Sequence, residues 1–172
     1  MLVGLSFLFV LLIEGSVFSF FMLEKALPDI FLVMVVSLGF ILDERRGAVI
    51  GLCAGLLQDV IFSSAVGFFA LAKMLIGYGA GLLGREFYRE QLFAPALLVF
   101  VATLSHELLL YLLVSRLMGS GMPVQWSLSR LFIPKAFYNT ALTMLLYPLF
   151  FRLYYRRRQP KIGLNRRRGV AR

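Results

Sequence analysis

The sequence predicts an all-α membrane protein built as a polytopic bundle of about six transmembrane helices, and three observations lead to this prediction. Hydrophobic residues make up 60% of the 172 positions and the mean hydropathy is +0.84, which excludes an ordinary soluble domain. Polar breaks divide the chain into six apolar stretches of helical length. Basic residues gather in alternate breaks, as expected where cytoplasmic segments separate membrane spans.

The polar breaks define the predicted helices in chain order. Residues 2–23 lack a basic start and a small-residue cleavage site after the apolar core, so we interpret them as a retained helix and not a signal peptide. The second stretch begins near Pro28, which suits the first turn of a helix, and ends by Leu42. The remaining stretches cover residues 47–62, 68–83, 92–114 and 128–151.

The second and third stretches, residues 28–42 and 47–62, are short for membrane spans. At about 15 residues each they reach roughly 22 Å, less than the roughly 30 Å of a bilayer core. Either flanking polar residues extend them, or the bilayer thins locally, or the two form a re-entrant pair.

The basic residues predict the orientation of the bundle. With the N-terminus in the cytoplasm, the inside segments hold four arginines and the nine basic residues of the tail, and the outside loops hold three basic residues. Both termini are therefore expected to be cytoplasmic, and topology accounts for the net charge of +9 without nucleic-acid binding. The predicted organisation is a transmembrane domain at residues 1–151 and a basic, disordered tail at 152–172.

Six titratable side chains interrupt the apolar stretches and form the candidate site. A charge in hydrocarbon is costly, so it normally faces a bundle interior, is paired, and marks a functional position. The six residues are Glu14, Asp59, Lys73, His106, Glu107 and Lys135.

Glycines recur at every fourth position on the third and fourth stretches, which gives each a smooth face for close helix packing. The stretches are antiparallel across a turn at residues 63–67, with Asp59 and Lys73 at similar depth on either side. We therefore expect an Asp59–Lys73 ion pair, which either belongs to a functional site or is purely structural. The glycines are Gly47, Gly51 and Gly55, followed by Gly77 and Gly81.

Glu107 and Lys135 lie at matching depths on the last two stretches and form a second expected pair. His106 points roughly 100° away from Glu107 around the helix, either as a hydrogen-bonded interior residue or as a proton-linked one. Glu14 lies in the middle of the first stretch without an evident partner. Three carboxylates against two lysines leave one negative charge, which a protonated carboxyl, a protonated His106 or a partner's cation would balance.

Enzyme and metal signatures are missing from the sequence. It contains no HExxH, GxSxG or phosphate-loop motif and no paired Cys–His spacing, so we expect no cofactor and no metal. An intramembrane enzyme would have to use His106 and Glu107 as its acid–base pair. The single Cys53 lies in an apolar run and is expected to be a small buried residue.

The pattern of residues 28–110 resembles the MreD family of bacterial rod shape-determining proteins. The shared features are Pro28-Asp29 at the start of the second stretch, the glycine row that ends at Asp59, and Lys73 before Gly77-Tyr78. The family motif carries over onto Gly51, Gly55, Asp59 and Gly67.

This resemblance implies a six-helix inner-membrane protein similar to the substrate-binding subunits of energy-coupling-factor vitamin transporters. It implies a non-enzymatic role in the cell-elongation machinery beside the bitopic protein MreC, with a wall polymerase, a penicillin-binding transpeptidase and an actin-like cytoskeleton as further partners. The alternative is a small-molecule binding or transport subunit of the energy-coupling-factor type.

Overall fold

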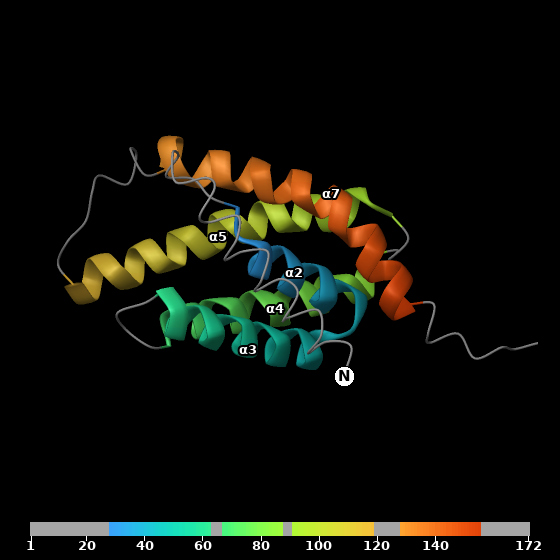
Figure 1. Ribbon diagram of the computed structural model, residues 1–172, viewed down its shortest axis with the longest axis horizontal. Helices are drawn as coiled ribbons and strands as arrows, with labels where there is room; N and C mark the ends of the chain where they lie inside the picture. Colours follow the sequence, from blue (N-terminus) through green and yellow to red (C-terminus); the bar gives the residue numbers. More distant parts are fainter. Residues whose placement is uncertain (1–27, 63–66, 88–90, 119–127, 156–172) are drawn as a thin grey trace, which may run out of the picture.

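The computed structural model describes residues 28–62, 67–87, 91–118 and 128–155, and within these ranges all regular secondary structure is helical, without a strand (Figure 1). The predicted first helix, with Glu14, and most of the predicted tail lie outside these ranges. The helices are α2 (Ile30–Ile41), α3 (Glu44–Phe62), α4 (Phe68–Glu86), α5 (Phe93–Met118) and α7 (Ile133–Tyr155), with a π-helical turn η1 (Leu128–Phe132) leading into α7.

The bundle is arranged around α2. Figure 1 shows α2 between two helix pairs, with α3 and α4 on one side and α5 and α7 on the other. α2 packs against all four of these helices. The two pairs are therefore held together largely through this central helix.

The sequence of α2 explains its central position, because it is apolar all the way round and a helix of that kind is stable only when surrounded. All twelve of its residues are buried. One side contacts Ile50 and Tyr147, and the other contacts Ala80, Val99 and Ala102.

The α3–α4 pair is packed through glycine, as the glycine rows predict. An added Cβ at Gly51 would overlap the backbone carbonyl of Lys73, and one at Gly47 would overlap that of Gly77. α2 joins the same contact, since a Cβ at Gly39 would lie 2.8 Å from the Gly77 carbonyl oxygen. The absence of side chains at these positions is what allows three helix backbones to meet.

The helices extend into two predicted links. The break at residues 43–46 forms the first turn of α3, because Asp43 caps it by accepting a hydrogen bond from the Arg46 N–H at 2.8 Å. Arg85 belongs to the last turn of α4 and pairs with Glu44 on the neighbouring helix. α3 therefore has 19 residues and spans roughly 28 Å, whereas α2 has 12 and spans roughly 18 Å.

One helix among the described residues is long and apolar enough to cross a membrane by length and composition, the 20-residue segment Phe93–Leu112 with a mean hydropathy of 1.8. α2 is apolar but short. α3 and α4 carry charged residues in their terminal turns and several glycines, which lowers their mean hydropathy. α7 continues to Tyr155, four residues into the segment predicted as tail.

The outer surface of the bundle is apolar. Val60 on α3, Phe93 on α5 and Leu145 on α7 are each at least 74% exposed, as expected for side chains that face lipid. Cys53 lies on this outer surface of α3, so the expectation of a buried cysteine is wrong. Helical periodicity accounts for its position, since the neighbouring Leu52 and Leu56 are exposed as well.

Two glycine substitutions test the close packing of α3 against α4. Gly51→Ala would place a methyl group against the Lys73 backbone, so we expect the free energy of unfolding to fall by about 1–3 kcal/mol. A Cβ atom at Gly79 would meet open space, so Gly79→Ala is the matched control. Its free energy of unfolding should rise by up to about 1 kcal/mol, because alanine favours the helix more than glycine does. Thermal unfolding in detergent measures both, and equal stability of the two variants would contradict the packing.

Candidate functional site

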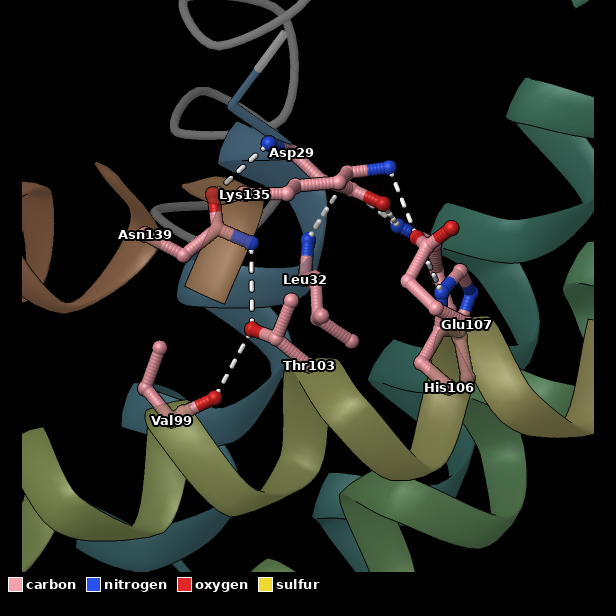
Figure 2. A network of polar contacts seen from close by, with 9 residues as sticks. Asp29, Leu32, Val99, Thr103, His106, Glu107, Lys135 and Asn139 are labelled. Carbon is pink, nitrogen blue, oxygen red and sulfur yellow. Dashed lines mark hydrogen bonds and ion pairs between the residues drawn. The ribbon is translucent and has the colours of Figure 1, made fainter. Parts of the chain in front are cut away.

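A buried polar network lies at the start of α2 and is organised by Asp29 (Figure 2). Asp29 caps the helix, since its Oδ1 accepts a hydrogen bond from the Leu32 N–H at 2.8 Å. A carboxylate is favoured here because the exposed N–H groups of a helix start carry partial positive charge. Asp29 is only 3% exposed, so the helix start alone does not compensate for its burial.

Lys73 supplies the compensating charge from α4. Its Nζ lies 2.6 Å from Oδ1 and 2.7 Å from Oδ2 of Asp29, and the lysine side chain is fully buried. The ammonium group also lies 5.8 Å from the centre of the Phe31 ring, within range of a cation–π interaction. The pair therefore fixes the head of α2 to the middle of the glycine-packed hairpin.

Asn139 extends the network to α7 and α5. Its Oδ1 accepts a hydrogen bond from the Asp29 backbone N–H at 2.8 Å, and its Nδ2 donates to Thr103 Oγ1 at 3.1 Å. The Thr103 hydroxyl donates to the Val99 carbonyl on its own helix at 2.8 Å. Asn139 and Thr103 are completely buried, and this single chain of contacts links α2, α7 and α5.

The predicted Asp59–Lys73 pair is wrong, because the partner of Lys73 is Asp29. Asp59 instead caps the start of α4, where its carboxylate accepts hydrogen bonds of 2.9–3.0 Å from the backbone N–H groups of Gly67, Phe69 and Ala70. Similar depth on two antiparallel helices did not determine which way each side chain points. Asp59 therefore closes the α3–α4 hairpin, and its charge is balanced by backbone dipoles.

The predicted Glu107–Lys135 pair is confirmed. Lys135 Nζ donates to Glu107 Oε1 at 2.7 Å, joining α5 to α7. The same Oε1 lies 3.3 Å from Nδ1 of the fully buried His106, so His106 and Glu107 contact each other despite pointing in different directions. The Phe69 ring of α4 lies 6.0 Å from the His106 ring.

The structure thus brings together four of the six predicted residues and adds three that sequence reasoning missed. Lys73, His106, Glu107 and Lys135 belong to the network, whereas Asp59 acts separately and Glu14 lies outside the described residues. The missed residues are Asp29, Thr103 and Asn139. An amide such as Asn139 inside an apolar stretch was the available signal, and Asp29 was hidden because it stands in a polar break.

The residues of this network neutralise one another's charges and join neighbouring helices. The buried carboxylates of Asp29 and Glu107 each face a lysine, so the two pairs balance without any further ion. No group of three or more possible metal ligands occurs in the part of the chain that the structure describes. Polar contacts of this kind are a common means of joining helices in membranes.

Comparison with known proteins identifies one family. The model of the family described as rod shape-determining protein MreD matches residues 1–157 of the chain. Searches of curated proteins and of solved structures found no match.

A double-mutant cycle tests the pairing of Asp29 with Lys73. Lys73→Met leaves a buried carboxylate without its partner and should cost about 3–5 kcal/mol of stability. Asp29→Asn together with Lys73→Met should cost clearly less than the sum of the single changes, because neither variant group then carries an unpaired charge.

The control for this cycle is Glu44→Gln with Lys73→Met. Glu44 pairs with Arg85 at the opposite end of the hairpin, so these two effects should add within about 0.5 kcal/mol. Unfolding in detergent provides the free energies. Additive effects for Asp29 and Lys73 as well would show that the two side chains do not interact.

Proposed function

The chain belongs to the MreD family of rod shape-determining proteins, and on this premise we propose that it is a non-enzymatic scaffold of the bacterial cell-elongation machinery in the inner membrane. The observation that carries the proposal is the extent of the family match, residues 1–157 of 172. Membership of this family implies a role in rod shape determination.

The polar network supports a scaffold more than a reaction site. Asp29, Lys73 and Asn139 are buried, and each contacts another group of the bundle, so none is presented to a substrate. A catalytic group has to reach a reacting atom within hydrogen-bond distance. His106 and Glu107, the pair that an intramembrane enzyme would have to use as acid and base, contact each other, and Glu107 Oε1 also accepts a hydrogen bond from Lys135.

We further propose that the bundle has six spans, similar to the substrate-binding subunits of energy-coupling-factor transporters, with both termini in the cytoplasm. The arrangement of the described arginines is consistent with this orientation. Arg45 and Arg46 lie in the first turn of α3, and Arg85 and Arg152 lie in the last turns of α4 and α7, so these four gather at one end of the bundle (Figure 1). Arg116 near the end of α5 and Arg130 in η1 lie at the other end, so four of the six arginines in the described helices are on the side proposed as cytoplasmic.

The proposed partners are those of the elongation machinery. A bitopic MreC-like protein would bind the bundle in the membrane, and the complex would connect an actin-like cytoskeleton with the wall polymerase and transpeptidase of lateral peptidoglycan synthesis. The apolar outer faces of α3, α4, α5 and α7 offer surface for a partner's transmembrane helix as well as for lipid.

A small-molecule binding or transport subunit is the alternative function. A solute that used the polar network would have to displace contacts such as Lys73–Asp29 at 2.6 Å, because these groups already satisfy one another. The scaffold proposal needs no such rearrangement of the bundle.

Depletion of the protein in its native host tests the function. We expect cells to become round or wide, since lateral wall synthesis would lose its membrane scaffold, and microscopy measures the width. Cells that stay rod-shaped but need a nutrient supplied would contradict the scaffold and favour the transport subunit.

Reporter fusions test the orientation. A reporter that is active only in the cytoplasm should work when it is fused after Arg152, and one that is active only outside should work when it is inserted near Gly121. The charge bias of the loops is the physical reason. An exported C-terminus would overturn the six-span arrangement.

A further inference from the structure

Glu107 uses only part of its hydrogen-bonding capacity within the bundle. Both of its contacts, from Lys135 Nζ at 2.7 Å and from His106 Nδ1 at 3.3 Å, are made to Oε1. Figure 2 shows the other carboxylate oxygen pointing away from the drawn contacts. The Glu107 side chain is 15% exposed, so part of it lies at the surface of the bundle.

The residues one turn away from Glu107 on the same side of α5 are mostly apolar. Leu104 and Tyr111, one turn before and one turn after Glu107 on the same side of α5, are half-buried, and Leu108 is 42% exposed. Glu107 lies inside the candidate membrane span, five residues or roughly 7.5 Å from its end at Leu112. An acceptor at this depth is costly unless a donor reaches it, because hydrocarbon supplies none.

We propose that this face of α5, consisting of Leu104, Glu107, Leu108 and Tyr111 and here called the Glu107 face, receives a transmembrane helix of the membrane partner. That helix presents an uncharged hydrogen-bond donor, such as Ser, Thr, Asn or Gln, to Glu107. This inference rests on the proposed function, since it assigns a place on the bundle to the scaffold's partner.

The chemistry of the Glu107 face determines the kind of partner. Lys135 already neutralises Glu107, so a cationic residue on the partner would leave a net positive charge in the span. The neighbouring leucines favour an apolar helix, and one free oxygen needs one donor. A neutral donor within an otherwise apolar transmembrane helix matches both requirements.

Disulfide cross-linking tests the location. In a Cys53→Ser background, which removes the single native cysteine, Leu108→Cys is compared with Val60→Cys on the 76% exposed outer face of α3. The partner is a co-expressed bitopic MreC-like protein with single cysteines placed along its transmembrane helix. We expect the heterodimer band from Leu108→Cys and none from Val60→Cys.

Affinity measurements on the purified complex test the donor. Glu107→Leu with Lys135→Met removes the acceptor without leaving an unpaired charge, and the dissociation constant should rise roughly 3- to 16-fold, the range for interhelical hydrogen bonds. The matched control is Asp43→Asn with Arg46→Gln, which removes an exposed ion pair at the start of α3. This control should leave the dissociation constant unchanged.

Other outcomes overturn the inference in distinguishable ways. Cross-links from Val60→Cys alone, a homodimer through Leu108→Cys, or cross-links from Leu108→Cys to a cysteine placed in residues 1–27 would assign the face to another occupant. Unchanged affinity in the Glu107 and Lys135 double variant would exclude the donor. A wild-type chain that retains no partner at all would remove the proposed scaffold function itself.

Discussion

The ion pair between Asp29 and Lys73 is the interaction on which the rest of the bundle depends. α2 is buried on every side, and its first residues bring a carboxylate into the interior with them. That carboxylate accepts a hydrogen bond from the Leu32 N–H in the first turn of α2. The Lys73 ammonium group balances its charge, with Nζ 2.6 and 2.7 Å from the two carboxylate oxygens. Loss of either partner would leave a buried charge without its counter-ion.

The glycine row places Lys73 where this pair can form. The backbone of Lys73 lies so close to Gly51 that α3 has no room for a Cβ atom there. Asp59 fixes the same hairpin at its closed end through three backbone N–H groups. Asn139 and Thr103 then connect the head of α2 to α7 and α5, and Glu107 with Lys135 joins α5 and α7 to each other.

Sequence patterns predicted the parts of this arrangement that depend on position along a helix. The glycine spacing predicted the α3–α4 contact, and equal depth predicted Glu107 with Lys135. The same argument from depth failed for Asp59 and Lys73, because depth does not specify the direction of a side chain around the helix axis. The central place of α2 was also hidden, since an all-apolar helix has the same composition whether lipid or protein surrounds it.

The central claim is that the buried network acts by holding the bundle together, and shape rescue at matched protein levels tests it most directly. Asp29→Asn, Lys73→Met and Asn139→Leu variants would each be expressed in depleted cells until the folded amount in the membrane equals that of wild type, and cell width would then be measured. The account predicts normal rods for all three variants at matched amounts. Wide cells with wild-type amounts of a folded variant would contradict it, because the network would then have a role beyond folding.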